Sequence, residues 1–201
     1  MQYSVTFVNN SNQAGTACLY QQGAGSVPNV MSLAWFTKFI SPNTTMLFRW
    51  SLDYSFVWAE TGVLVPGVVF DTGQLLPADP SSGSRVQFTQ VAGGFTFEGE
   101  EQGGSPGSLS IQSSGTIPQN QAAVGIGMSG RGTFATQAQP NTNVVFTPRP
   151  AYWLAFGNFV QGQVLDVGRI PNPVRIDFPP GVYSITATLN RDNSWTIATT
   201  S

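Results

Sequence analysis

The chain has 201 residues, of which only 9% are charged, and its eight basic and ten acidic residues give a net charge of −2. Because the basic residues are scattered singly, the electrostatic footprint that nucleic-acid binding requires is missing. The longest apolar run, residues 63–70, is interrupted by Pro66 and Gly67 and is too short to span a membrane. We therefore expect neither a nucleic-acid partner nor a membrane span.

The residues that support most enzyme chemistry are scarce. The chain has no histidine, and Cys18 is its only cysteine, which excludes imidazole-based catalysis and zinc sites built from these residues. A lone cysteine fits a reducing compartment, and the first ten residues lack the basic and apolar regions of a classical secretion signal. We expect a cytoplasmic protein without cofactors or metals, with non-classical export left open.

Alternation of apolar and polar residues begins near the N-terminus, in residues 3–9, and predicts β-strands. The clearest pattern spans residues 47–61, where aromatic or aliphatic residues occupy every second position over eleven residues. One straight strand of that length is unusual, so we expect a bend or bulge within it. The aromatic residues of this stretch are predicted to form the structural core: Phe48, Trp50, Tyr54, Phe56 and Trp58.

Short alternating runs separated by Gly, Pro and Asn turns continue to the C-terminus, and no stretch has a helical period. The last two runs, 182–189 and 195–200, flank the turn 190–193 and are expected to pair as a hairpin with their apolar residues on one face. About a dozen strands with little or no helix predict an all-β fold. The expected architecture is an antiparallel β-sandwich, with a flattened barrel as the alternative.

The organisation along the chain is simple. Strands of the same style resume on both sides of the Gly-, Ser- and Pro-rich stretches near 76–84 and 98–108, which we therefore interpret as loops and not as domain linkers. No repeat of fixed period is evident. We expect a single β-sandwich domain over residues 1–201.

Gly125, Gly127 and Gly130 match the G-x-G-x-x-G spacing of a dinucleotide-phosphate loop. Such a loop precedes a helix whose N-terminus faces the phosphate, yet the residues that follow, 131–140, have no helical stripe. The acidic residue that should contact the ribose about 20 positions further on is also missing. We interpret the motif as a glycine-rich strand whose missing side chains let a bulky partner or another backbone approach.

Paired carboxylates are the remaining route to hydrolysis. Glu98 and Glu100 are two positions apart, so on a regular strand they share a face about 7 Å apart, which is near the separation in inverting glycosidases. Both border a Gly- and Ser-rich loop, where carboxylates normally stay solvated. Asp53 and Glu60 give no second aligned pair, because an odd spacing places them on opposite faces of a regular strand. We expect a protein that is not an enzyme, and we assign no catalytic residue.

Exposed aromatic rings with acidic, amide or guanidinium groups nearby often hold sugars, but an uninterrupted alternating stripe is what a buried sheet face requires. Tyr152 and Trp153 are adjacent and must face opposite sides, which makes one of them a candidate for a surface contact. Arg131, beside the glycine motif, is expected to be a solvated surface charge, with anion binding as the alternative. The candidates for ligand or interface contacts are Arg49, Asp53, Arg131, Tyr152 and Trp153.

Several segments resemble the RhiA family, which comprises rhizosphere-expressed proteins of rhizobia and related bacteria. These segments are VPNVMSLAWF (27–36), RWSLDYSFVWAETGVLVPGV (49–68), QAAVGIGMSG (121–130), FTPRPAYWLAFGNF (146–159) and QGQVLDV (161–167). The resemblance runs from near the N-terminus to about residue 180, and its tryptophan-containing segments are the most specific. It implies a bacterial protein with quorum-controlled expression and life near plant or animal hosts, and it implies no catalytic residues.

We predict a non-enzymatic protein that acts by association. A polar surface with little charge provides little mutual repulsion and so favours self-assembly into a homo-oligomer or a higher assembly, or binding to a surface partner. The alternative is a carbohydrate-binding, lectin-like sandwich with a glycan as its partner. A hydrolase that uses Glu98, Glu100 or Asp53 is the less favoured third hypothesis.

Overall fold

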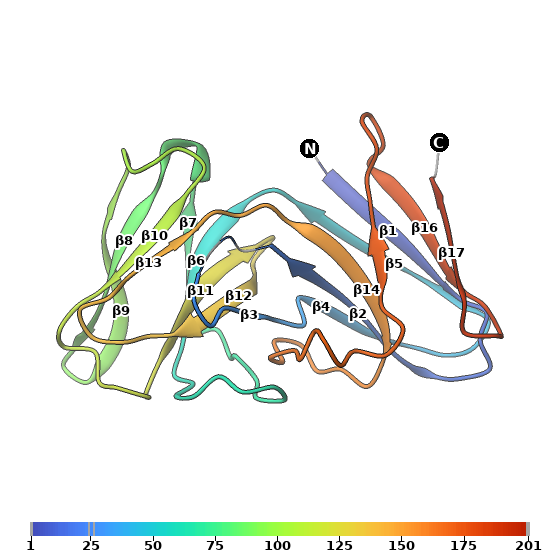
Figure 1. Cartoon of the computed structure of the whole chain (residues 1–201), viewed down its shortest axis with the longest axis horizontal. Coiled ribbons are helices and arrows are strands. Elements are labelled where there is room, and N and C mark those ends of the chain that lie inside the picture. Colours follow the sequence, from blue (N-terminus) through green and yellow to red (C-terminus); the bar gives the residue numbers. More distant parts are fainter. Residues whose placement is uncertain (1, 24, 26, 200–201) are drawn as a thin grey trace.

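The computed structural model describes residues 2–23, 25 and 27–199, and nearly all regular structure in them is β-strand. The strands form four sheets, and none of these sheets closes on itself (Figure 1). The 3₁₀ turn Pro80–Ser82 is the helical exception among the described residues. The expected all-β, sandwich-like fold is confirmed, with 17 strands in the described residues instead of about a dozen.

We number the sheets and give their strands in spatial order. Sheet I contains β17 (Trp195–Thr199), β16 (Ser184–Leu189), β1 (Gln2–Asn9) and β5 (Thr44–Ser51). Sheet II contains β15 (Val174–Ile176), β14 (Ala151–Gly157), β2 (Gly15–Gln22) and β4 (Phe36–Ile40). Sheet III contains β3 (Met31–Ser32), β12 (Arg131–Gln137), β11 (Ala123–Met128), β6 (Tyr54–Ala59) and β7 (Gln74–Ala78). Sheet IV contains β13 (Asn143–Phe146), β10 (Leu109–Ser113), β8 (Arg85–Val91) and β9 (Gly94–Glu101).

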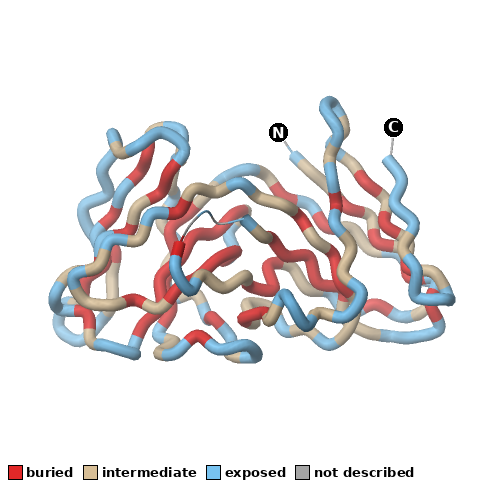
Figure 2. The backbone as a smooth tube through the Cα atoms, in the orientation of Figure 1, coloured by how far each residue is buried: buried red, intermediate tan, exposed pale blue. Residues whose placement is uncertain are grey.

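The four sheets pack as two sandwiches. Sheets I and II enclose one core, which includes Phe7, Trp35 and Trp50, and sheets III and IV enclose another, which includes Phe88 and Phe134. Figure 1 shows the first sandwich on the right and the second on the left. Figure 2 shows that most buried segments lie in the strands of both halves, while most turns are exposed. Removing the apolar face of each sheet from water is the main favourable term in folding.

Sheets II and III are covered on their second faces as well. Residues 60–73 fold over sheet III and contribute Leu64 to a further buried cluster. Residues 158–173 fold over sheet II and contribute Leu165 in the same way. Because β6 and β11 are therefore covered on both faces, they are buried almost continuously instead of at every second residue.

The aromatic stretch 47–61 contributes to both sandwiches. The expected bend lies at residues 52–53, between β5 and β6, and Leu52 is 43% exposed there because the chain passes from one sandwich to the other. The predicted core aromatics divide accordingly, with Phe48 and Trp50 buried in the first sandwich, Phe56 and Trp58 buried in the second, and Tyr54 half-buried against both.

The ladders are antiparallel except for two, which differ from the expected pattern. β1 pairs with β16, and β8 pairs with β10, in parallel at the centre of sheets I and IV. The predicted C-terminal hairpin is present as β16 and β17, with Leu189 opposite Trp195 and Ala187 opposite Ile197. Since β16 lies beside β1, the first and last strands of the described chain complete one sheet.

Apart from β3, a two-residue strand at the edge of sheet III, the two sandwiches share one strand topology. Strands β1, β2, β4 and β5 correspond to β10, β11, β12 and β13, and strands β6 to β9 correspond to β14 to β17. Every corresponding ladder runs in the same direction, including the parallel one. The chain thus contains two structural repeats, and each sandwich combines the first four strands of one repeat with the last four of the other.

A weak sequence similarity accompanies this topology, although the sequence shows no repeat of fixed period. The motif Pro-Asn-Thr at 42–44 recurs at 140–142. The two asparagines have φ angles of 58° and 55°, and each threonine Oγ1 donates to the carbonyl oxygen three residues earlier, at 2.6 and 2.7 Å. The same shift relates further identical pairs, namely Phe36 and Phe134, Phe48 and Phe146, Tyr54 and Tyr152, and Gly83 and Gly181. These matches are too few and too widely spaced to show a period in the sequence.

The two stretches interpreted as loops are shorter than expected. β7 continues to Ala78 and β9 to Glu101, because each pairs along its length with a neighbouring strand. Since both repeats are needed to complete either sandwich, a single domain stays our prediction.

Candidate functional site

Gly125, Gly127 and Gly130 lie in the hairpin of β11 and β12, and no helix follows them. A Cβ atom on Gly125 would lie 2.0 Å from the carbonyl oxygen of Phe134, and one on Gly127 would lie 2.5 Å from another β12 carbonyl oxygen. Ser129 and Gly130 both have positive φ, as a two-residue hairpin turn requires. The interpretation of the motif as a close approach between strands is confirmed.

Most aromatic side chains point into the cores. The rings of Trp35 and Trp50 have centroids 5.4 Å apart, and that of Tyr152 lies 5.0 Å from Trp50. Trp35 Nε1 donates at 2.9 Å to the carbonyl oxygen of Met128, at the end of β11, and so links the first sandwich to sheet III. These rings hold the interior together and are not available to a glycan.

Tyr152 and Trp153 face opposite sides of β14, as adjacent strand residues do. Tyr152 belongs to the core of the first sandwich, and burial raises the pKa of its phenol. Trp153 is half-buried on the second face of sheet II, where it stacks on Tyr20 with centroids 6.5 Å apart. Both rings therefore contact the protein itself.

The three charged candidates are exposed, and Asp53 lies near Arg131, since the Asp53 carbonyl oxygen accepts from the Ser129 amide at 3.0 Å in the β11–β12 turn. Arg49 lies on β5, and Asp53 lies at the bend that follows that strand. The guanidinium of Arg131 stands over the Phe36 ring, 4.8 Å from its centroid, and hydrogen-bonds to Gln161. The side chains of Arg131, Tyr152 and Trp153 are thus engaged within the protein itself, and the five predicted contact residues do not line one common pocket among those described.

Glu98 and Glu100 do not share a face of β9, contrary to the sequence-based expectation. Gly99 between them has a φ of 60°, and the ladder with β8 shifts at this point. Such a bulge adds one residue and reverses the alternation. Glu101, instead of Glu100, lies on the same face as Glu98, and its carboxylate is 3.3 Å from Arg85. The aligned pair of carboxylates that would support hydrolysis is therefore not formed by these residues.

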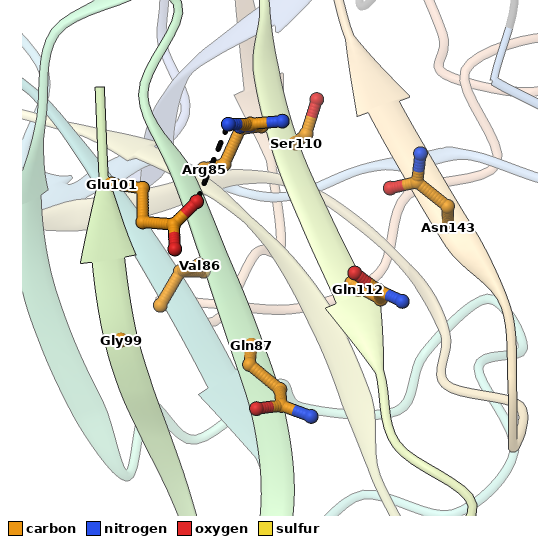
Figure 3. A pocket seen from close by; sticks show the side chains of 8 residues that line it. All are labelled: Arg85, Val86, Gln87, Gly99, Glu101, Ser110, Gln112 and Asn143. Carbon is orange, nitrogen blue, oxygen red and sulfur yellow. Dashed lines mark hydrogen bonds and ion pairs between the residues drawn. The ribbon is translucent and has the colours of Figure 1, made fainter. Parts of the chain in front are cut away.

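The outer face of sheet IV carries a polar groove of about 270 Å³ (Figure 3). Two rows of side chains cross the strands β9, β8, β10 and β13 there. The first row is Glu98, Gln87, Gln112 and Asn143, and the second is Glu101, Arg85, Ser110 and Val145; Glu98 and Val145, at the ends of the rows, do not line the groove itself. Because residues opposite each other on neighbouring strands lie about 5 Å apart, each row is a continuous line of side chains.

The groove is polar but nearly neutral. Arg85 and Glu101 form an exposed ion pair, which contributes little stability, and the first row adds three neutral side-chain amides and the carboxylate of Glu98. In the part of the chain that the structure describes, no three acidic or cysteine side chains are placed to hold a metal ion. The described helical structure contains no segment long and apolar enough to cross a membrane.

Sequence reasoning missed the amides of this groove. Gln87 and Gln112 alternate with the buried residues Val86, Phe88 and Ile111, which is the one local signal that they point outward. That signal does not show that β8 and β10 are neighbours, so the alignment of the two amides appears only in the fold.

A second surface feature is β17, the free edge of sheet I. Four of its five residues are exposed and none is charged. Its ladder with β16 leaves the backbone amide and carbonyl groups of Ile197 and Thr199 on the open side. Ile197 lies opposite the buried Ala187, on the core side of the sheet, yet it is 39% exposed. The first core is therefore not closed at this edge.

The corresponding edge strand of the other repeat, β9, is protected. It carries the Gly99 bulge and the carboxylates of Glu98, Glu100 and Glu101, and bulges and charges both block strand pairing. Its backbone amide at Phe97 also donates to a glutamine side chain of β7 at 3.1 Å. The described residues of β17 include neither a bulge nor a charge.

Two comparisons, one with a family model and one with a known protein, each match nearly the whole chain. The family model for RhiA matches residues 1–200. The chain is 39% identical over 199 residues to Protein RhiA of Rhizobium leguminosarum bv. viciae, an alignment that covers 98% of this chain and 86% of that protein. No solved structure matches the chain significantly.

Proposed function

The chain belongs to the RhiA family, and we propose that it acts without catalysis, by association with copies of itself. The observation that carries this proposal is the edge strand β17, which is uncharged and open along its outer side. Two copies related by a two-fold axis would pair β17 with β17 and extend sheet I across both chains. Ile197 of each copy would then be covered.

The chemistry of the surface supports the same proposal. A net charge of −2 on 201 residues gives weak repulsion between copies. Pairing of one edge with the identical edge is isologous and closes at the dimer, so larger assemblies require a further surface. A strand of five residues contributes few hydrogen bonds, each worth about 1 kcal/mol net, so that the association is weak and depends on concentration.

The proposal also includes the conditions under which a bacterium would produce the protein. Quorum-controlled production near a host, which the family resemblance implied, would supply the high concentration that a weak dimer requires. A cytoplasmic location is part of the same proposal. In the second version of the proposal, β17 pairs with a different surface partner instead of with a second copy of this chain.

Sedimentation velocity over a range of protein concentrations tests the proposal. The wild-type protein should shift from monomer toward dimer as the concentration rises, and Ile197→Lys should remain monomeric because a charge at the edge opposes pairing. Val91→Lys is the matched control. Like Ile197, Val91 is an exposed, β-branched apolar residue of a strand, but it lies on β8, in the other sandwich. A wild-type protein that stays monomeric at all concentrations, or an unaffected Ile197→Lys variant, contradicts the proposal.

A further inference from the structure

The groove on sheet IV contains side chains that the fold does not use. Gln87, Gln112 and Asn143 stand side by side on β8, β10 and β13 (Figure 3). No hydrogen bond joins these three side-chain amides to any described residue. Other glutamines do bond within the protein, as Gln74 does by accepting from Trp58 Nε1 at 2.9 Å. The three amides are therefore free to bond to something outside the chain.

The outer face of sheet I shows how the other sandwich covers the corresponding surface. There the parallel strands β1 and β16 present short hydroxyl side chains, and Ser4 donates to Ser184 at 3.0 Å. On these two strands the face is covered by short side chains, although the neighbouring β5 adds Leu47 and Arg49. The longer, unbonded amides of sheet IV are a difference between the repeats that packing does not require.

The bulge in β9 gives the groove its open side. Gly99 lines the groove, and a Cβ atom built on it would meet no atom within 4 Å. β-Bulges are frequent beside functional sites because they redirect a strand and its side chains. Here the bulge brings Glu101 beside Arg85 at one end of the groove and leaves space above the strand.

We propose that this groove binds a neutral, polyhydroxylated chain, that is, a glycan. A side-chain amide donates and accepts hydrogen bonds at once, as a hydroxyl group does, so a row of amides complements a row of hydroxyls. The groove lining offers an anionic ligand no unpaired cation, because Arg85 is paired with Glu101, and the carboxylate of Glu98 lies opposite Gln87 at the edge of the groove. Neighbouring strands are about 4.8 Å apart, so the row of four spans about 14 Å, a length suited to a short oligosaccharide.

Charge and polarity also separate this ligand from other classes. An apolar protein surface would find few partners here, because Val145 is the exposed apolar side chain of the two rows. The site goes beyond the self-association proposed above and uses a different sheet from β17. The two activities can therefore be lost separately.

An array of neutral and anionic glycans, probed with the labelled full-length protein, tests this proposal. We expect retention on neutral glycans, and an affinity about tenfold weaker for Gln87→Glu and Gln112→Glu, since each change removes amide donors and adds a charge. Gln119→Glu, at an exposed loop position, is the matched control and should bind like the wild type. The Ile197→Lys variant should also retain binding.

Each alternative result contradicts the proposal. A protein that is retained by no neutral glycan has no such site, and preferential retention on anionic glycans assigns the wrong ligand class. Equal binding by the wild type and by both groove variants places the ligand elsewhere. Thermal unfolding of every variant, with transitions close to the wild type, shows that a loss of binding is not a loss of folding.

Discussion

The substitution Gly125→Ala tests why the hairpin of β11 and β12 is rich in glycine. The added Cβ would lie 2.0 Å from the carbonyl oxygen of Phe134 and 2.9 Å from the Cα of Ala135, whereas real Cβ atoms essentially never come closer than 3.0 Å. The strands must therefore separate by at least 1.0 Å, measured between that Cβ and the carbonyl oxygen. Both atoms belong to the backbone of a buried strand, so no side-chain rotation relieves the contact.

The cost follows from that displacement. Overpacking in a core costs about 1–3 kcal/mol, and stretched ladder hydrogen bonds add about 1 kcal/mol each, so we expect a loss of about 3–5 kcal/mol in the free energy of unfolding. A chain of this size loses about 2–4 °C of Tm per kcal/mol, which gives a decrease of about 6–20 °C. Urea unfolding followed by tryptophan fluorescence, together with calorimetry, measures both quantities.

Gly94→Ala is the control for this experiment. Gly94 also lies in a strand, but a Cβ atom on it would meet only a carbonyl oxygen at 3.7 Å, so the substitution should be neutral or stabilise by up to about 1 kcal/mol. If Gly125→Ala unfolds within about 0.5 kcal/mol of the wild type, the reasoning from close approach is refuted, and another reason for the glycine is needed.

Further predictions concern the buried tryptophan and the buried thiol. Trp35→Phe removes the indole N–H that donates to the carbonyl oxygen of Met128, and it should lower the free energy of unfolding in urea by about 2–4 kcal/mol. Trp195→Phe loses a similar hydrogen bond at a half-exposed ring, so it should lower this free energy by less than about 1 kcal/mol. Because Cys18 is fully buried, iodoacetamide should modify it in urea but not in the native protein, as read by mass spectrometry. Burial raises the pKa of the Cys18 thiol, so the stability it contributes is complete below the unfolded-state pKa of about 8.5 and is lost as the pH rises above it. Between pH 8.5 and 10 the wild type should lose up to about 1.4 kcal/mol per pH unit more than Cys18→Ala, and equal slopes would contradict this.

The periodicity of the sequence predicted the strands well but not their partners. The alternation over residues 47–61 and the final hairpin both correspond to observed strands, and the bend expected in the long run lies at residues 52–53. The assignment of β5 and β6 to different sandwiches depends on contacts with strands far along the chain. No local pattern contains that information.

The candidate site was less accessible to sequence reasoning. The alternation of side chains along a regular strand predicts that Glu98 and Glu100 lie on the same face. Gly99, a single residue in the left-handed region, reverses the alternation, so the two carboxylates lie on opposite faces. The alignment of Gln87 with Gln112 arises from a parallel ladder between two strands that are not consecutive in the chain. Both features follow from backbone conformation and register, which composition and spacing do not encode.

The exchange of strands between the two repeats has a consequence for synthesis on the ribosome. β1 is made early and finds β5 soon afterwards, but the side of β1 that meets β16 stays open until nearly the whole chain has been made. Parallel pairing over so long a sequence separation folds slowly and leaves apolar strands exposed meanwhile. The first sandwich can therefore close only after β16 has left the ribosome, and until then the side of β1 that will meet β16 lacks its partner.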